Sequence, residues 1–382
     1  MGMLMVDLAR ICSAALTHTN GPSTRPLPWL VVAAVDGFST DSEASQKARP
    51  PPGGWFGTRL RGGRHRARPR RIGLVDPRAP GHRPQLGEQC ALVAPRMGVG
   101  DAHSSADYSR LVDVLRANQI SDAYFHVGPL DGDGRIAAQR YLHAPELLAA
   151  IHRSAPGVHL QAYIAQLLTG AGGPLDLGSA AVRNRVLDSA SALLDLGFDG
   201  IHYDIEPVAP ANGYFLDLLG RTHDLTRAHQ AILSASIQKV ELLPGSSRVL
   251  HSTLVPVGNS WPFTTGGFLQ AVAVWVDQVA VMVYDTPLPS APLIGAVYAW
   301  ETARVLQLIG DRTMVFIGVP TYEEGLHPTG EDLHTAIRGA RRGIAQLRSR
   351  PRSPYGLAVF AEWTTSAREW AIWREDWLFP NG

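Results

Sequence analysis

The chain has 382 residues, of which 45% are hydrophobic and 18% are charged, so it is long enough for a large domain and too apolar for a disordered protein. Lys and Arg number 35 and Asp and Glu 34, and this balance excludes a uniformly basic nucleic-acid-binding protein. Only Cys12 and Cys90 occur, which excludes a disulfide framework and a cysteine-based zinc cluster. Stability must therefore come from a hydrophobic core.

The first 88 residues differ in composition from the rest. Residues 38–88 are dominated by Arg, Gly, Pro and Ser, which predicts a low-complexity and disordered segment over residues 1–88. A basic arm for nucleic acid is disfavoured, because Gly and Pro interrupt the charges and few aromatic residues lie between them. The longest early apolar run, residues 29–35, is shorter than the roughly 20 residues of a membrane-spanning helix. The N-terminus also lacks a readable signal peptide.

From about residue 89 the chain alternates between short β-branched runs and amphipathic helical patterns. A helix is predicted over residues 181–196, because its apolar residues share one face and Gly197 follows as a C-cap residue. Eight strand–helix units in about 290 residues match the size of a (β/α)8 TIM barrel over residues 89–382. An open doubly wound sheet is less favoured, since no Gly-rich phosphate loop is present. Strands are predicted at residues 121–127, 158–165, 200–206, 232–238, 278–284, 313–320 and 356–363, with an earlier one within residues 91–99.

The predicted strand over residues 200–206 carries the most informative pattern. Side chains alternate along a strand, so His202, Asp204 and Glu206 share one face. With the other, apolar face against the helices, these three point into the barrel, and Glu206 is nearest the C-terminal rim where barrel active sites lie. Burial of ionisable groups is costly, which favours a catalytic site over a structural polar network. A carboxyl group beside another carboxyl group has a raised pKa, so Glu206 is the expected general acid and Asp204 its partner.

Three segments resemble glycoside hydrolase family 18, the chitinase-like barrels. The segment Asp199-Gly-Ile-His-Tyr-Asp-Ile-Glu206 is similar to the Asp-Gly-x-Asp-x-Asp-x-Glu motif of the fourth strand in that family. Met282-Val-Tyr-Asp285 at the sixth predicted strand resembles its Met-x-Tyr-Asp, and Trp363 at the eighth resembles its pocket-floor Trp. The resemblance covers roughly residues 90–380 in layout.

This resemblance implies a glycosidase that hydrolyses an N-acetylhexosamine-containing glycan with retention, by a substrate-assisted mechanism without a metal or cofactor. Glu206 would protonate the glycosidic oxygen, and the substrate's own 2-acetamido carbonyl would attack the anomeric carbon. Asp204 would orient and stabilise the resulting oxazolinium ion. Tyr284 would hydrogen-bond to the acetamido group, Asp285 would support it, and Trp363 would stack under the sugar. A carbohydrate substrate of this kind predicts a secreted or cell-envelope protein.

Two departures from the family pattern predict a divergent member. His202 stands where the family has its middle Asp, and a charged imidazole there would favour an ionised Asp204 and keep it from sharing a proton with Glu206. The third predicted strand, residues 158–165, also lacks the Ser-x-Gly-Gly of most chitinases.

Four further residues are candidate substrate contacts, with packing inside the barrel as the alternative. Tyr124 lies on the second predicted strand, Gln161 and Tyr163 share a face of the third, and Gln238 ends the fifth. No His-x-His or His-Glu-x-x-His spacing indicates a metal site.

Two other functions stay open at this stage. Ile205-Glu206-Pro207 resembles the Asn-Glu-Pro of retaining barrel glycosidases that use their own nucleophile, which here would be Glu323 or Glu324 after the seventh strand. Because His202 interrupts the acidic series, a chitinase-like carbohydrate-binding protein without catalysis is the other alternative.

Overall fold

The structure is a computed structural model that describes residues 90–93, 99–242, 263–286, 288, 290–322 and 330–380. The predicted low-complexity segment over residues 1–88 lies outside the described residues, and so do Glu323 and Glu324. The predictions for these positions, including the domain boundary at residue 89, therefore stay predictions.

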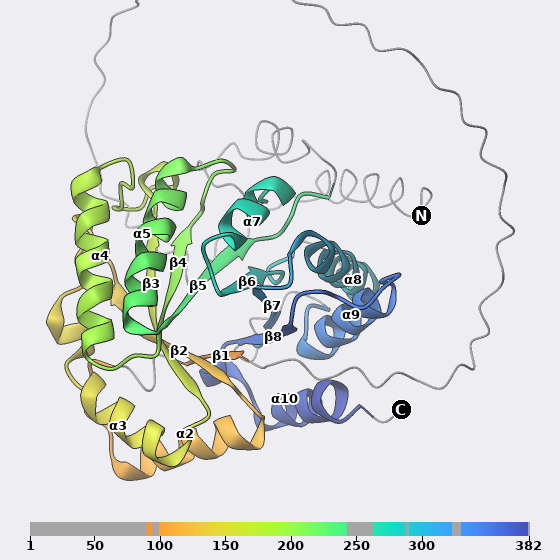
Figure 1. Ribbon diagram of the computed structural model, residues 1–382. Coiled ribbons are helices and arrows are strands. Elements are labelled where there is room, and N and C mark those ends of the chain that lie inside the picture. The colour runs from red at the N-terminus through yellow and green to blue at the C-terminus, as the bar shows by residue number, and fades with distance from the viewer. Residues whose placement is uncertain are drawn as a thin grey trace, which may run out of the picture. The chain divides into compact units, whose positions relative to one another are not determined.

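The described chain forms a curled parallel sheet whose strands follow one another around a barrel in chain order, as Figure 1 shows. The short first strand pairs with both the second and the last strand. This arrangement of alternating parallel strands and helices confirms the predicted barrel-like α/β class. The strands are β1 (Cys90–Val93), β2 (Asp122–Pro129), β3 (His159–Leu167), β4 (Gly200–Glu206), β5 (Ile232–Gln238), β6 (Gln278–Met282), β7 (Met314–Pro320) and β8 (Tyr355–Phe360).

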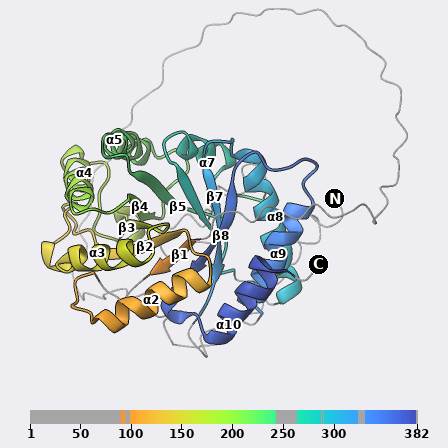
Figure 2. The ribbon, with the colours of Figure 1, turned by 60° about the horizontal axis from the view of Figure 1, so that its bottom comes forward.

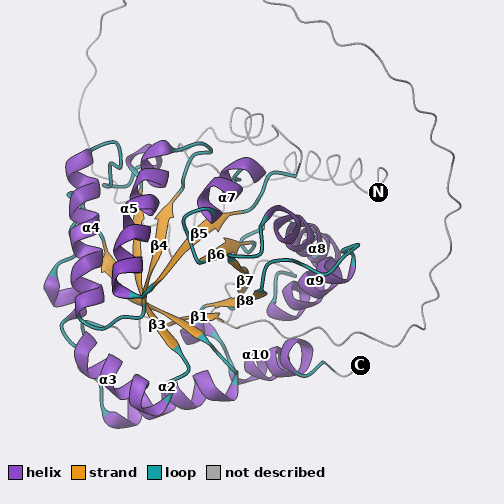
Figure 3. Cartoon of the chain, in the orientation of Figure 1, coloured by secondary structure: helices purple, strands orange, loops and turns teal. Residues whose placement is uncertain are grey.

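Helices surround the strands on the outside, as the two ribbon views and the cartoon show (Figures 1, 2 and 3). None of the described helices is long and apolar enough to cross a membrane. The helices are α2 (Ser105–Ala117), α3 (Ala144–Ser154), α4 (Ala180–Asp195), α5 (Gly213–His229), α7 (Gly266–Ala273), α8 (Ala291–Leu308), α9 (Leu333–Ala345) and α10 (Ala367–Ile372), with the 3-10 turns η1 (Ala138–Tyr141), η2 (Thr169–Ala171) and η3 (Glu362–Thr364) and the π-helical segment η4 (Trp373–Leu378).

Helix α4 illustrates how local sequence sets these elements. Ser179 caps its first turn by accepting a hydrogen bond from the Val182 amide, and five apolar residues of one face are buried. Gly197 follows the helix with a φ of 103°, a conformation that glycine adopts without strain. The helix predicted over residues 181–196 is therefore confirmed within one residue at each end.

Two predicted strands end earlier than expected. β6 ends at Met282 instead of Tyr284, because the Lys239 ammonium group binds the carbonyl oxygens of both residues. β8 ends at Phe360, so Trp363 lies in the turn η3 and not on a strand. There the Ala361 carbonyl accepts hydrogen bonds from nearby threonine hydroxyls, which replace strand pairing.

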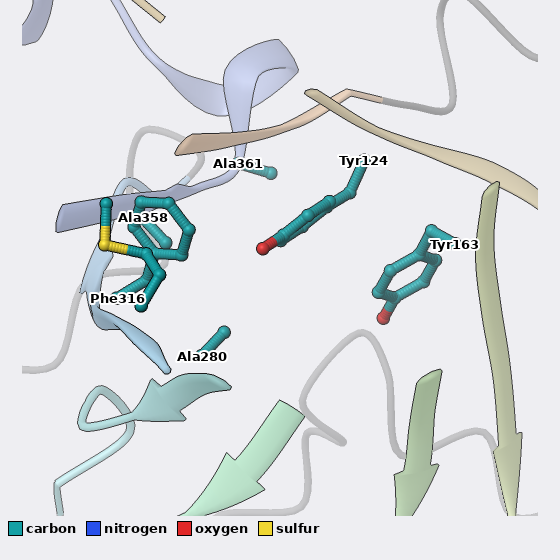
Figure 4. Packing of buried hydrophobic residues seen from close by; sticks show 7 residues of the cluster. Tyr124, Tyr163, Ala280, Phe316, Ala358 and Ala361 are labelled. Atoms are coloured by element: carbon teal, nitrogen blue, oxygen red, sulfur yellow. The ribbon is translucent and has the colours of Figure 1, made fainter. Parts of the chain in front are cut away.

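The barrel interior has an apolar layer in its middle. Figure 4 shows Tyr124 and Tyr163 projecting into this space from neighbouring strands, beside the smaller residues of the opposite wall. The buried members are Tyr124, Tyr163, Ala280, Met314, Phe316, Ala358 and Ala361.

A polar network lies at the N-terminal end of the barrel strands, which we call the base. Asp122 Oδ1 accepts hydrogen bonds from Gln161 Nε2 at 2.9 Å and from Gln278 Nε2 at 2.8 Å. All three side chains are buried. In the register of β3 and β4, Gln161 pairs with Gly200 and Leu167 pairs with Glu206, so the base and the rim are opposite ends of the barrel.

Candidate functional site

The C-terminal end of β4 carries two carboxyl groups of the candidate site. The outward face of this strand packs against helices, where the Tyr203 hydroxyl lies 3.0 Å from Thr222 Oγ1 of α5. His202 and Asp204 alternate with these outward residues, are 1% and 9% exposed, and line a small interior cavity. Glu206, the last residue of the strand, is partly buried at the rim. The structure thus has the order of side chains that strand alternation predicts.

Asp204 lies among hydroxyl groups of both neighbouring strands. The Tyr163 hydroxyl of β3 donates to Asp204 Oδ2, and Ser236 of β5 lines the same small cavity. Burial raises the pKa of Asp204, while the hydroxyl groups of Tyr163 and Ser236 act in the opposite direction. Its other oxygen, Oδ1, is buried and has no hydrogen-bond partner within the described part of the chain. This oxygen is an acceptor that a ligand group can satisfy.

Glu206 is set up to hold a proton. Burial raises the pKa of Glu206 well above its usual range, and the neighbouring charge of Asp204 raises it further. Asp285 acts in the same direction, while the positive charge of Lys239 lowers the pKa. Because the raising effects dominate, Glu206 can carry a proton near neutrality, as a general acid requires.

His202 is neutral, which corrects the picture of a charged imidazole beside Asp204. Burial lowers the pKa of His202 to about 3. Its ring is stacked on Tyr124 at a centroid distance of 3.9 Å and lies nearly parallel to Tyr163 at 5.4 Å. Both ring nitrogens contact neutral hydroxyl groups of β5, Nδ1 with Ser234 at 2.8 Å and Nε2 with Ser236 at 2.9 Å. Within the described part of the chain neither nitrogen has an acidic partner, so no opposite charge offsets the cost of a buried charge.

Tyr284 lines the same cavity from the end of β6. Its ring is buried and stacks on Phe360 at a centroid distance of 4.9 Å. Gly318 of β7 leaves room for the ring, since a Cβ atom at this position would lie 2.8 Å from Tyr284 Cε1. Phe360 and Gly318 were not predicted as site residues, because an aromatic residue and a glycine in buried strands carry no signal of their own.

Asp285 follows directly and is exposed, with a φ of 57°. The Tyr322 hydroxyl donates to Asp285 Oδ1 at 2.9 Å, and the Asp285 amide donates to the same hydroxyl oxygen at 3.3 Å. Tyr322 thereby fixes the carboxylate beside Tyr284. Tyr322 was likewise absent from the sequence-based prediction.

Lys239 was also not predicted as a site residue from the sequence. Its Nζ donates to the Tyr284 carbonyl at 2.6 Å and to the Met282 carbonyl at 3.4 Å, which ties the end of β5 to the end of β6. Burial lowers the pKa of Lys239, opposed by several carboxyl groups that include Asp285 and Glu206. A signal existed in the sequence, since Lys239 is one of only two lysines and follows a predicted strand directly.

Two buried glutamates complete the acidic surroundings of Lys239. Glu301 accepts a hydrogen bond from the Val240 amide, and burial raises the pKa of Glu301 to about 8. Glu331 accepts from the Thr286 amide through both carboxylate oxygens, and burial raises the pKa of Glu331 to about 7. Glu301 lies within α8 and Glu331 in the loop before α9, where sequence periodicity gives no indication of a carboxyl group in the interior.

Of the remaining predicted residues, some lie at the candidate site and others do not. Trp363 is partly buried and makes an edge-to-face contact with Phe360 at 6.3 Å, which connects it with Tyr284. Gln161 belongs to the network at the base, so the structure does not bring it to the site. Gln238 is buried at the end of β5, and its Nε2 atom has no hydrogen-bond partner among the residues described.

A groove with a volume of about 360 Å3 lies beside the end of β4. Pro207, which follows Glu206, forms part of its wall. Tyr214 is 54% exposed in this wall, and the Arg183 guanidinium lies 5.1 Å from the centre of its ring. The described residues contain no group of three or more His, Cys, Asp or Glu side chains that could hold a metal ion.

Comparison with solved structures places this geometry among known folds. No family profile and no curated protein sequence matches the chain. The chitinase of Chromobacterium violaceum ATCC 12472 is similar with a TM-score of 0.52 and 10% identity over 76% of this chain and 98% of that chain. The Bacillus megaterium QM B1551 spore cortex-lytic enzyme SleL has a TM-score of 0.51 and 12% identity over 78% of this chain and 75% of that chain.

The Bacillus cereus spore cortex-lytic enzyme SleL is similar to the same degree, with a TM-score of 0.51 and 10% identity over 76% of this chain and 74% of its own. At such identities the likeness concerns the fold. It agrees with the resemblance that the three sequence motifs indicate. The chain therefore has the barrel fold of chitinases and spore cortex-lytic enzymes.

Proposed function

We propose that this protein is a (β/α)8 glycoside hydrolase, a divergent member of family 18, that cleaves N-acetylhexosamine-containing glycans. The observation that carries the proposal is the pair of carboxyl groups at the end of β4. Glu206 has a raised pKa at the rim, and Asp204 beside it keeps one buried oxygen that has no partner among the residues the structure describes. The shared fold with chitinases and cortex-lytic enzymes supports the same conclusion.

In the first step Glu206 gives its proton to the glycosidic oxygen as the bond to the anomeric carbon breaks. The carbonyl oxygen of the substrate's 2-acetamido group forms a new bond to that carbon on the opposite face. The product is an oxazolinium ion, whose positive charge and N–H group need an anionic acceptor. Asp204 Oδ1 is suited to this role, because it is a buried carboxylate oxygen with free acceptor capacity.

In the second step the Glu206 carboxylate takes a proton from water, and the water oxygen bonds to the anomeric carbon. The bond to the acetamido oxygen breaks, and the acetamido group is regenerated. Two inversions at one carbon give net retention. Glu206 ends the cycle with its proton restored.

The surrounding residues bind and orient the substrate in this proposal. The Tyr284 hydroxyl donates a hydrogen bond to the acetamido group. Asp285, which Tyr322 holds in place, supports the same group. Tyr163 keeps Asp204 in position. Trp363 offers an aromatic surface under the sugar, and its contact with Phe360 keeps it next to Tyr284.

The test is hydrolysis of β-linked N-acetylglucosamine oligomers by the wild-type protein and by Glu206→Gln, with Glu375→Gln as the control. Glu375 is an exposed carboxyl group outside the barrel, so its replacement leaves the rate unchanged. We expect cleavage by the wild type and the control, and a loss of at least about 100-fold in the Glu206 variant. A thiazoline analogue of the intermediate should inhibit the wild type.

Other outcomes point to the alternative functions. Cleavage that the thiazoline does not inhibit assigns the nucleophile to the protein, with Glu323 or Glu324 as the candidates. Binding of the oligomers without turnover indicates a carbohydrate-binding protein. Either result contradicts the proposed mechanism.

A further inference from the structure

The groove beside the end of β4 begins next to the general acid of the proposed mechanism. Its walls come from the segments that follow β3 and β4, the strands whose ends meet at this part of the rim. The Leu168 amide donates to the Glu206 carbonyl at 2.8 Å, and Pro207 forms the adjoining wall. The volume of about 360 Å3 lies in the range of pockets that hold small ligands, roughly 300–1,000 Å3. A glycan chain bound at Glu206 can therefore continue into the groove.

Tyr214, near the start of α5, gives this groove an aromatic wall. It is 54% exposed, and the Arg183 guanidinium lies over its ring at 5.1 Å from the centre. Asp217 binds the Arg183 guanidinium at 2.7 Å, and the carbonyls of Leu177 and Gly178 accept from it at 2.5 and 3.2 Å. A cation–π contact thus holds the ring while much of its surface stays open. The C–H groups on one face of a pyranose sugar form an apolar surface that packs on such a ring.

Two polar side chains of the groove can bind sugar hydroxyl groups. Asn212 Oδ1 accepts from the Tyr214 and Phe215 amides at 3.1 Å each, and its Nδ2 has no protein partner in the described structure. Asp176 Oδ1 accepts from the Gly178 amide at 2.8 Å, and its Oδ2 likewise has no partner among the described residues. The groove therefore offers an amide donor and a carboxylate acceptor beside the aromatic ring.

The charge of the groove indicates which sugars it accepts. Among the described residues that line it, Asp176 is the only charged one. The nearby Arg183 is paired with Asp217 and lies against the Tyr214 ring. A carboxyl group on a sugar would therefore meet a negative charge without a cation to bind it, whereas an uncharged sugar meets no such repulsion.

We infer that this groove binds uncharged sugar units of the glycan chain beyond the bond that is cleaved, with Tyr214 as the stacking surface and Asp176 acting against sugars that carry a carboxyl group. The inference rests on the proposed function, because the chain that enters the groove is the chain bound at Glu206. It assigns a substrate class, a neutral N-acetylglucosamine polymer in preference to a glycan whose alternate sugars carry a lactyl carboxylate.

Removal of the ring separates binding in the groove from the chemical step. For an N-acetylglucosamine pentamer, Tyr214→Ala should raise KM about fivefold to tenfold and leave kcat within about twofold, because a contact of equal strength in ground and transition states acts on KM alone. For the dimer, which is too short to fill the groove, the change in KM should stay below about twofold. An unchanged KM for the pentamer overturns the inference.

Two further variants serve as controls for Tyr214→Ala. Tyr214→Phe keeps the ring and should retain the wild-type KM for the pentamer within about twofold. Phe379→Ala removes an aromatic ring that is 59% exposed and lies outside the groove, so the KM should not change. A rise in KM in Phe379→Ala equal to that in Tyr214→Ala would contradict a specific role of the groove.

Asp176→Asn tests the charge of the groove and keeps Oδ1 as an acceptor for the Gly178 amide. The substrate is an oligomer of the same length whose alternate sugars carry a lactyl carboxylate. Wild type should cleave it with a lower kcat/KM than the neutral pentamer, and Asp176→Asn should raise this kcat/KM about twofold to threefold at low ionic strength. The gain should vanish in about 1 M salt, where the Debye length is about 3 Å. A wild type that prefers the carboxylate-bearing oligomer overturns the assigned substrate class.

Binding without turnover keeps failure of the groove distinct from failure of the mechanism. Calorimetric titration of the full-length Glu206→Gln protein with the neutral pentamer, with and without Tyr214→Ala, should show an affinity about fivefold to tenfold weaker without the ring. If wild type cleaves no glycan while this weakening is found, the proposed function fails and the groove stands. If wild type cleaves the pentamer while neither KM nor affinity responds to Tyr214→Ala, the groove inference is wrong and the proposed function stands.

Discussion

The base and the rim of the barrel both contain a buried aspartate on the inward face of a strand, yet the two are surrounded differently. At the base, Asp122 accepts hydrogen bonds from two glutamine amides at one oxygen and from Ser121 at the other. At the rim, Asp204 accepts a hydrogen bond from the Tyr163 hydroxyl at one oxygen, while the other has no partner in the described structure. A fully bonded carboxylate holds strands together, whereas a partly bonded one is available to a ligand.

The carboxyl groups around Lys239 reinforce this difference. Around the rim the pKa values of Glu206, Glu301 and Glu331 are all raised by burial, and a lysine lies among them. The base combines its aspartate with neutral amides, a tyrosine hydroxyl and the half-exposed His159 imidazole, whose Nδ1 lies 3.4 Å from Asp122 Oδ1. The rim therefore concentrates groups that change protonation near neutral pH, which hydrolysis of a glycosidic bond requires.

Replacing Asp204 and Asp122 by asparagine, one at a time, tests the difference between rim and base most directly. Asp204→Asn should lower kcat by at least about 100-fold, because the charge that stabilises the oxazolinium ion is lost. Asp122→Asn should leave kcat nearly unchanged and destabilise the fold by about 1–3 kcal/mol, because the amide nitrogen that replaces one carboxylate oxygen cannot accept the hydrogen bond from Ser121. Kinetics and thermal unfolding of both variants check this. The opposite pattern, with loss of activity only in Asp122→Asn, contradicts the assignment of base and rim.

The position of Tyr284 at the rim depends on Gly318. Gly318→Ala introduces a Cβ atom 2.8 Å from the Tyr284 ring and 3.0 Å from the Val281 carbonyl oxygen. We expect kcat/KM to fall about tenfold, since the displaced hydroxyl no longer reaches the acetamido group. Gly267→Ala in α7 is the control, because no atom lies within 4 Å of a Cβ atom there. Equal kinetics for the two alanine variants would remove Tyr284 from the site.

The pH dependence of activity tests the charge arrangement at the rim. Glu206 must be protonated to act as the acid, so activity falls as the pH rises through its pKa. Lys239 lowers that pKa, and Lys239→Gln keeps a hydrogen-bond donor while removing the charge. We expect the basic limb of the kcat profile to move up by about 0.5 to 1 pH unit. A limb that stays in place, or moves down, shows that Lys239 does not act on Glu206.

The smallest expected effect is that of Glu301→Gln on the thermal stability of the fold. Its pKa is raised from 4.5 to about 8 in the folded protein, so the stability it contributes is complete below pH 4.5 and is lost as the pH rises towards 8. Glu301→Gln does not ionise and keeps an acceptor for the Val240 amide. The variant should therefore gain in Tm over wild type by a few degrees between pH 5 and pH 8 and then level off. A constant difference over this range would show that Glu301 is ionised in the folded state.

The sequence predicted the strand of the candidate site better than the residues that surround its carboxyl groups. Period-two alternation places Asp204 and Glu206 correctly, because a strand leaves each side chain only two directions. The sequence pattern did not predict where the strands end, since β6 and β8 both end earlier than expected. There a distant lysine and several threonine hydroxyls compete for the backbone carbonyls.

Contacts between residues far apart in sequence could not be read from periodicity. The partners of His202 come from β5, 32 and 34 residues away, and only their placement reveals a neutral ring. Tyr322 lies 37 residues from Asp285. A motif identifies the reacting groups, whereas their protonation depends on neighbours that the fold assembles.

The most direct test of the central claim is hydrolysis of two aryl β-glycosides that differ only at the 2-position of the sugar, one with an acetamido group and one with a hydroxyl group. The account predicts cleavage of the acetamido sugar alone, with retention at the anomeric carbon, and its loss in Glu206→Gln. Comparable cleavage of the 2-hydroxyl sugar would show that the nucleophile belongs to the protein and would contradict the account.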